Sequence, residues 1–407
     1  MSADCKDSIS AVFEVNFTRL TESYVMRLLP KKIDDPVYNV KEQKLSPMDR
    51  YFTQFIRDER DLPFIYLSFK ILCTVPPIGT GHLRHMMLSF NDASSTLHHT
   101  GLLLYTPLLQ GWLWFAVAAL DLMLISLVFL GPYTLMLHLT SHRKFFISDL
   151  DLMNKLVPWV IGPFMGQSPE SYYSHHIGMH HPENNLRKDG SSTMKYQRDS
   201  AIDFLKYFSS FMLLGVYELS LYLASEKKRK IHRNLIIGEL WSYCFLATMC
   251  YINMRACVVV FLLPYVIIRF GMMSGNWAQH AFIHPEQPFN CYTNSITCIN
   301  AAYNKLCFND GYHIGHHLHP AMHWTDYPAD FLRTTDQYVL HDAIVFEQLD
   351  FFVIWFFLML RRYDWLAHYY VDLGGKYKSQ DEVIRLLKSR TMKFSLHAVP
   401  LVTAAAT

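Results

Sequence analysis

The chain has 407 residues, and its 37 lysines and arginines nearly balance 35 acids, which leaves a net charge of about +2. This balance gives no electrostatic basis for binding nucleic acid. Apolar residues make up 51% of the chain, aromatics 15% and charged residues only 18%, which is below the charged share usual in soluble domains. Because the apolar residues are grouped into long runs, the sequence predicts an integral-membrane protein.

The chain divides into three parts. Residues 1–62 are polar and of mixed charge, with early acids that interrupt any secretory signal pattern, so we expect a cytosolic N-terminal region. Residues 63–345 carry the long apolar runs and form the expected membrane catalytic domain. Residues 346–407 begin with an apolar run, Phe351 to Leu360, that is too short to span a bilayer. We expect this run to be an interfacial helix, followed by a C-terminal tail.

The strongest membrane signal is the run from Leu102 to Leu137, which contains one charge, Asp121. At 1.5 Å per residue, a single helix of this length would far exceed a hydrocarbon core of about 30 Å. Pro107 and Gly111 therefore favour a hairpin whose second helix begins near Trp112. A single helix that protrudes from the bilayer is the alternative.

Two further apolar runs, 204–224 and 235–270, flank a basic loop at 227–233. If each run crosses the membrane once, the basic loop lies on the side opposite the active site, against the tendency of lysine and arginine to stay cytosolic. If 235–270 is instead a hairpin that turns at Asn253 and Arg255, the loop stays cytosolic and 204–224 must lie flat or re-enter. We expect two simple crossings, because the charge rule is statistical.

Four short clusters of candidate metal ligands lie beside the apolar runs. Within each cluster, side chains three or four residues apart share one face of a helix. Neutral imidazoles that converge on one point are suitable ligands for a transition metal. The candidate ligands are His138, His142, His176, His180, His181, Asn276, His280, His313, His316 and His317.

Nine imidazoles exceed the four ligands that one zinc ion normally takes. Two iron ions with about five ligands each would use them, and four inward-facing helices can enclose such a pair. Asn276 is a weak ligand that acts through water, or else an ordinary polar residue of a helix.

Ligating imidazoles also need hydrogen-bonding partners. We expect these partners among polar residues beside the clusters. His175 is also an alternative to His176 as a ligand. The candidates are His175, Glu183, His284, Asn309, Asp310 and His319.

The segments H-L-T-S-H, H-I-G-M-H-H, N-W-A-Q-H and H-I-G-H-H resemble the ordered histidine boxes of the integral-membrane fatty acid desaturase and hydroxylase superfamily. The resemblance covers roughly residues 110–330. It implies an all-α integral-membrane fold, with about four transmembrane helices and a cytosolic helical cap that carries the boxes. It also implies a non-haem centre of two iron ions (Fe²⁺) with O₂ as co-substrate.

The same resemblance implies partners and a location. The substrate would be a membrane lipid or fatty acyl chain, and electrons would come singly from a cytochrome b5 or ferredoxin-type donor. The chain has no H-P-G-G haem motif, so we expect this donor to be a separate protein. Arg143 and Lys144 directly follow the first cluster and mark its side as cytosolic, in keeping with a place in the endoplasmic reticulum and an active site that faces the cytosol.

Two features leave the reaction open. Box two has three residues between its first and second histidines, where many desaturases have two. In addition, N-W-A-Q-H stands where many plant-type desaturases have no box. Membrane alkane hydroxylases look similar in both respects. We expect a desaturase that introduces a double bond into a lipid acyl chain, with a hydroxylase of alkanes, fatty acids or related lipids as the alternative. A zinc lipid hydrolase or a metal transporter is disfavoured, because the clusters lie at the ends of apolar runs and not at mid-membrane.

Overall fold

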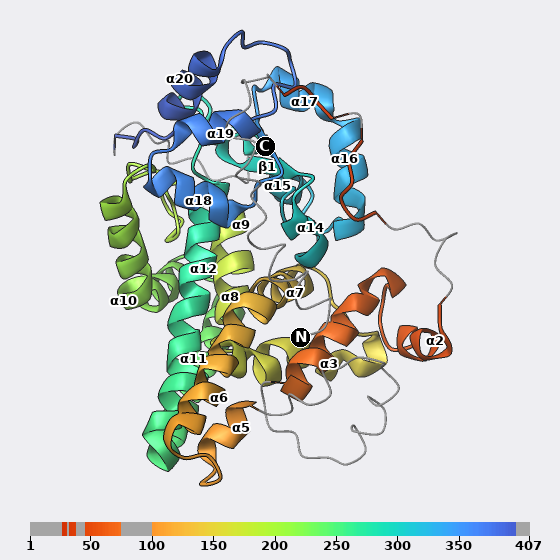
Figure 1. The fold of residues 1–407 in the computed structure, drawn as a ribbon, viewed down its shortest axis with the longest axis vertical. Coiled ribbons are helices and arrows are strands. Elements are labelled where there is room, and N and C mark those ends of the chain that lie inside the picture. Colours follow the sequence, from red (N-terminus) through yellow and green to blue (C-terminus); the bar gives the residue numbers. More distant parts are fainter. Residues whose placement is uncertain (1–26, 31, 38–44, 75–99, 396–407) are drawn as a thin grey trace. The chain divides into compact units, whose positions relative to one another are not determined.

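The computed structural model describes residues 27–30, 32–37, 45–74 and 100–395 (Figure 1). Its described residues fall into two compact units. The first contains residues 45–74, 100–172 and 233–269. The second contains residues 27–37 without residue 31, and residues 173–232 and 270–395. Helices dominate both units, which confirms the predicted helical class.

Three helical stretches among the described residues are long and apolar enough to cross a membrane: Gly111–His142, Ala201–Ser225 and Arg229–Gln279. The first begins one residue before the expected start at Trp112. It follows the short helix α5 (Thr100–Tyr105). The chain folds back between the two helices, as shown by the indole N–H of Trp114, which donates to the carbonyl oxygen of Leu104 at 3.1 Å. Gly111 has a φ of +56°, a conformation that glycine adopts without strain.

Besides this stretch and residues 233–269 of the third one, the first unit consists of short helices. The stretch Gly111–His142 is itself composed of α6 (Gly111–Met123), a π-helical turn η4 (Leu124–Phe129) and α7 (Leu130–His142). The remaining helices of this unit are α2 (Pro47–Thr53), η2 (Glu59–Asp61), α3 (Leu62–Thr74), η5 (Ser148–Lys155), η6 (Leu156–Ile161), η7 (Gly162–Met165) and the first residues of α8 (Ser171–His175).

The stretch Arg229–Gln279 is a hairpin and not one straight helix. Its parts are α11 (Arg229–Cys257), η9 (Val258–Leu262) and α12 (Leu263–Gln279), and Asn253 inside α11 has extended dihedral angles, φ −158° and ψ 96°. The Asn253 side-chain oxygen accepts from the N–H of Ala256 at 3.1 Å and so caps the second arm. Across the break, the rings of Phe245 and Phe261 lie 5.1 Å apart, whereas a straight helix would separate these residues by about 24 Å. The expectation of two simple crossings is therefore wrong, and the hairpin alternative holds.

Helix α10 (Ala201–Ser225) lies along the chain segment 178–191 within the second unit. Near its start, the Tyr207 hydroxyl donates to the carbonyl oxygen of Ser191 at 3.2 Å. Near its end, the Tyr222 hydroxyl donates to a carboxylate oxygen of Glu183 at 2.7 Å. Both ends of α10 thus contact the same histidine-bearing segment.

The rest of the second unit surrounds a two-stranded parallel sheet, which the all-helical expectation did not include. Strand β1 (Ile296–Ile299) pairs with β2 (Ile344–Glu347), with Ile296 opposite Ile344. Helix α18 (Phe351–Met359) buries Phe351, Ile354 and Phe357 in the core around this sheet. The other helices are α9 (His181–Glu183), α13 (Cys291–Asn294), α14 (Ala302–Leu306), α15 (His313–Leu318), η10 (Trp324–Asp326), α16 (Tyr327–Arg333), α17 (Thr335–Leu340), α19 (Tyr363–Tyr369) and α20 (Gln380–Arg390).

Candidate metal centre

The second histidine box contains a π-helical turn. Between α8 and α9, residues His176–His180 form η8, in which the N–H of His181 bonds to the carbonyl oxygen of His176, five residues earlier. A π-turn widens the helix, so residues five apart, and not four, lie above one another. His176 and His181 therefore come together, with their Nε2 atoms 3.1 Å apart, while His180 points to a different group.

One group of candidate ligands is His180, His280, His313 and His317, whose ring nitrogens all lie within 4.8 Å of one another. His280 follows the end of α12, and His313 and His317 lie one turn apart on α15. The Nε2 atom of His313 is 3.3 Å from that of His280 and 3.0 Å from that of His317. We call these four residues the distal group.

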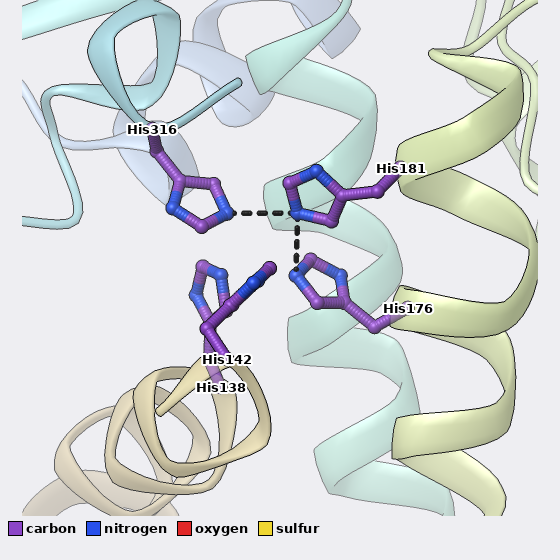
Figure 2. A group of neighbouring side chains, drawn as sticks. All are labelled: His138, His142, His176, His181 and His316. Atoms are coloured by element: carbon purple, nitrogen blue, oxygen red, sulfur yellow. Dashed lines mark hydrogen bonds between the residues drawn. The ribbon is translucent and has the colours of Figure 1, made fainter. Parts of the chain in front are cut away.

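A second group of ring nitrogens forms from His176, His181 and His316 in the same unit. Figure 2 shows His181 between the other two, with its Nε2 atom 3.1 Å from that of His176 and 3.0 Å from that of His316. We call these three residues the proximal group. The three histidines of the fourth cluster share α15 but not one group, because α15 directs His316 to the proximal group and His313 and His317 to the distal group.

The proximal and distal groups are neighbours. The ring of His181 lies 5.0 Å from that of His317 and 6.0 Å from that of His180, measured between centroids. Seven imidazoles of the second unit thus gather at two adjacent positions, each suited to one metal ion.

The separations of the ring nitrogens test whether metal ions fit. Two nitrogens bound to one metal at about 2.0–2.1 Å lie about 2.9–3.4 Å apart in tetrahedral or octahedral coordination. The four Nε2 separations given above range from 3.0 to 3.3 Å. Imidazoles that face one another with nothing to bridge them bury nitrogen lone pairs at a cost, so this geometry fits a metal at each position.

The protonation of the distal group also suits metal binding. Burial lowers the pKa of His280 to about 3. Burial, and to a lesser extent the nearby His313 ring, lowers the pKa of His317 well below its ordinary value. Both rings are therefore neutral near pH 7, which is the form that binds a metal.

The first histidine box lies on α7 in the first unit. His138 and His142 are one turn apart, their ring centroids are 5.4 Å from each other, and both extend from the same side of the helix (Figure 2). This is the i, i+4 arrangement predicted for the pair.

Asp189 orients a candidate ligand and was missed in the sequence. One of its carboxylate oxygens is 2.7 Å from Nδ1 of His180 and also accepts from the N–H of Asn185 at 3.2 Å. The other accepts from the N–H and the hydroxyl of Ser191, at 2.8 and 2.7 Å. Although burial alone would raise it, the His180 ring and these donors lower the pKa of Asp189 below its ordinary value. The carboxylate holds Nε2 of His180 toward the distal group.

Two further candidate ligands are held through Nδ1. Nδ1 of His280 lies 2.9 Å from the carbonyl oxygen of Asn294, and Nδ1 of His316 lies 3.2 Å from the hydroxyl of Tyr327. Each contact leaves Nε2 as the metal-facing nitrogen. The only sequence signal for these partners was a polar loop beside a box, which does not single out one residue.

The predicted supporting residues have varied surroundings. His175 is stacked near His180, with ring centroids 6.2 Å apart, and lies outside both groups. Asn276 donates from Nδ2 to the carbonyl oxygen of Ser191 at 3.1 Å and to the hydroxyl of Tyr207 at 2.7 Å.

The others contact parts of the chain away from the imidazoles. Asp310 accepts from the Tyr303 hydroxyl at 3.1 Å, and burial raises its pKa to about 7. The Asn309 side chain donates to the carbonyl oxygens of Pro36 and Trp324. Glu183 accepts from the hydroxyl of Tyr222, and Nδ1 of His284 accepts from the N–H of Glu286. The His319 side chain is exposed.

Comparison with known proteins identifies the family. The sequence model described as fatty acid desaturase matches residues 112–348, more than half of the chain, and this range contains all four boxes. No curated protein and no solved structure matches significantly.

Proposed function

The chain belongs to the fatty acid desaturase family, whose members are integral-membrane di-iron oxidoreductases, and from this premise we propose that it introduces a double bond into the acyl chain of a membrane lipid. The observation that carries the proposal is the pair of adjacent imidazole groups, with nitrogen separations that match two metal positions.

We propose His138 and His142 as the remaining ligands of the proximal group. Three imidazoles leave coordination positions to fill, and these two histidines have the helical spacing of a chelating pair. The proximal iron would then have five imidazoles, and the distal iron four together with Asn276. Since Nδ2 of Asn276 is committed to Ser191 and Tyr207, its amide oxygen is the atom that would act, through water.

When bound, two Fe²⁺ ions would supply the activation of O₂ that removal of hydrogen from an unactivated C–H bond requires. The residues of the chain hold this centre in place. Asp189, Asn294 and Tyr327 fix the tautomers of three imidazoles through Nδ1. Hydroxylation of an alkane, fatty acid or related lipid is the second candidate, because box two has the H-x-x-x-H-H spacing.

The hairpin supports one orientation in the membrane. Both ends of the hairpin lie with the imidazoles in the second unit, since Ile231 is close to Gly178 and His280 belongs to the distal group. We propose that α10 lies at the membrane surface, and that Arg143, Lys144 and the basic residues 227–233 are all cytosolic, as the positive-inside tendency favours. The active site then faces the cytosol, and we propose the endoplasmic reticulum as the membrane.

An external electron donor of the cytochrome b5 or ferredoxin type would meet this cytosolic face. The segment that holds Asp189 carries exposed Arg187 and Lys188, and Lys188 pairs with Glu226 at 2.9 Å. The loop that follows α10 exposes Lys227, Arg229 and Lys230. Lys228 in this loop donates to the carbonyl oxygen of Gly178 in η8 at 2.7 Å. This basic surface, residues 187–188 and 227–230, favours an acidic donor next to the distal group.

Lipid analysis tests the proposed function. Membranes of a host that produces the chain should contain an acyl species two mass units lighter than its precursor, which host membranes with the His317→Ala variant lack. An acyl species sixteen mass units heavier would identify the hydroxylase instead. No new lipid in a host that has a competent donor, with the protein present and loaded with iron, would contradict both reactions.

A further inference from the structure

The tip of the α11–α12 hairpin brings two cysteines together that are seven residues apart in the sequence. Cys250 lies near the end of the first arm and Cys257 near the start of the second, and their Sγ atoms are 2.7 Å apart. Asn253, which turns the chain between them, is the residue with extended dihedral angles. The contact therefore exists only because the chain reverses direction here.

Burial of each thiol does not by itself require the two sulfur atoms to lie this close together. The sequence suggested that the cysteines are small buried hydrophobes, and Cys257 is indeed fully buried, while Cys250 is partly buried. Independent burial explains each cysteine, but it does not explain why the two sulfur atoms point at each other. A disulfide requires two backbones that face each other at close range, with a Cβ–S–S–Cβ dihedral of about 90°, and a tight helical hairpin supplies such facing backbones.

The residues around the tip are of the kinds that favour a membrane–water boundary. Trp112 and Tyr251 are 79% and 92% exposed, and the guanidinium of Arg255 lies 3.7 Å from the ring centroid of Trp114. Tryptophan and tyrosine gather where the hydrocarbon meets the head groups, and an arginine is stable there next to an aromatic ring. The tip is thus within reach of soluble oxidants.

The side of the membrane decides the redox state of these thiols. The hairpin arms are long enough to cross a hydrocarbon core of about 30 Å. The first arm begins, and the second ends, beside the imidazole-bearing segments. If the imidazoles face the cytosol, the tip faces the opposite compartment, where thiols are oxidised. This step rests on the orientation argued under the proposed function.

We propose that Cys250 and Cys257 form a disulfide that closes the tip of the α11–α12 hairpin on the non-cytosolic side. The oxidant is the disulfide of a thiol–disulfide exchange protein in that compartment. One cysteine thiolate attacks it to form a mixed disulfide, and the second cysteine then displaces the carrier. The Sγ–Sγ bond forms, the carrier's bond breaks, and the carrier leaves as a dithiol with two electrons and two protons.

Counting thiols tests the proposal. Membranes are dissolved in SDS with excess N-ethylmaleimide, so that every reduced cysteine is alkylated whether buried or not. The protein is then reduced and treated with a maleimide of different mass. Of the eight cysteines, six should carry the first label and two the second, and peptide mapping should place the second label on Cys250 and Cys257.

Three variants complete the experiment. Cys250→Ser and Cys257→Ser should each abolish the second label entirely, since the remaining partner becomes a free thiol. Cys244→Ser, an exposed cysteine on the same helix, should keep the two second labels. Eight first labels on the unmodified chain would overturn the proposal, as would a second label on any other pair.

Measuring the lipid product in the same membranes separates this inference from the proposed function. Product together with eight free thiols overturns the disulfide alone. Two protected thiols at Cys250 and Cys257 without any product, in membranes that contain donor and iron, support the disulfide and contradict the proposed reaction.

Discussion

The Nε2 atoms of His176 and His181 are 3.1 Å apart, although five positions separate the two residues in the chain. In a regular α-helix, residues five apart point in clearly different directions, whereas the π-turn η8 brings them onto one face. The same turn directs His180 toward the distal group. One box thus supplies candidate ligands to both imidazole groups.

Iron content should reflect these two positions. The purified chain is expected to contain about two irons, and His181→Ala or His317→Ala should lower this number and abolish activity, because each removes an imidazole from one group. The spans do not depend on the metal, so both variants should stay in the membrane. His341→Ala, a histidine that contacts Asn290 and Tyr292 instead, should keep both irons. An active preparation with stoichiometric zinc and no iron would refute the di-iron centre.

Asp189→Asn should weaken iron binding or activity by roughly 10–100-fold, because it removes the charge that orients the His180 ring. Iron retention during dialysis against a chelator measures the effect independently of turnover. Asp381→Asn changes an exposed acid at the start of α20 and is the matched control. Equal iron retention in both variants would show that Asp189 has no positioning role.

Gly311→Ala should destabilise the chain by about 1–3 kcal/mol or more. A Cβ at Gly311 would overlap the carbonyl oxygen of Cys298 and the side-chain oxygen of Asn304, neither of which is the free end of a flexible side chain. Gly315→Ala, four residues further along the chain, would place its Cβ 3.5 Å from the Tyr327 ring, an ordinary contact. Thermal unfolding in detergent should give a lower Tm for the first variant only. If both variants unfold alike, the packing of the residues just before α15 against β1 is misplaced.

Glycosylation mapping should confirm the hairpin. Acceptor sites introduced between Lys227 and Lys230, near Arg187 and near Asp326 should remain unmodified, because all three face the cytosol in the proposed orientation. An acceptor in a polar spacer inserted at Asn253 should be glycosylated. Modification between Lys227 and Lys230 would restore two separate crossings, and modification near just one of Arg187 and Asp326 would place boxes two and four on opposite sides of the membrane.

Charge reversal on the basic surface should slow electron delivery. The double variant Lys227→Glu, Lys230→Glu should raise the KM for an acidic donor several-fold and weaken its dependence on salt, because the charges steer the encounter. Turnover driven by a small chemical reductant should be unchanged. The matched control is the double variant Lys378→Glu, Arg385→Glu. Lys378 lies just before α20 and Arg385 lies on it, and both side chains are exposed in the second unit. An unchanged donor KM in the first variant would place the docking surface elsewhere.

The amino-acid sequence by itself determined the membrane class, the position of the apolar helix that begins at Gly111, and the histidine clusters. These features depend on composition and on spacings of three or four residues, which are local properties of a helix. The correct family followed from the order of the boxes, and the match over residues 112–348 confirms it.

Only the tertiary structure decided how the imidazoles divide and how the hairpin folds. The division depends on the π-turn η8 and on Asp189, and neither has a pattern in the sequence that distinguishes it from an ordinary turn or loop acid. The run 235–270 satisfies the hydrophobicity of one crossing or of two arms equally well. What separates these alternatives is contact between residues remote in the chain, such as Phe245 with Phe261, and packing energy of this kind is absent from any local window of sequence.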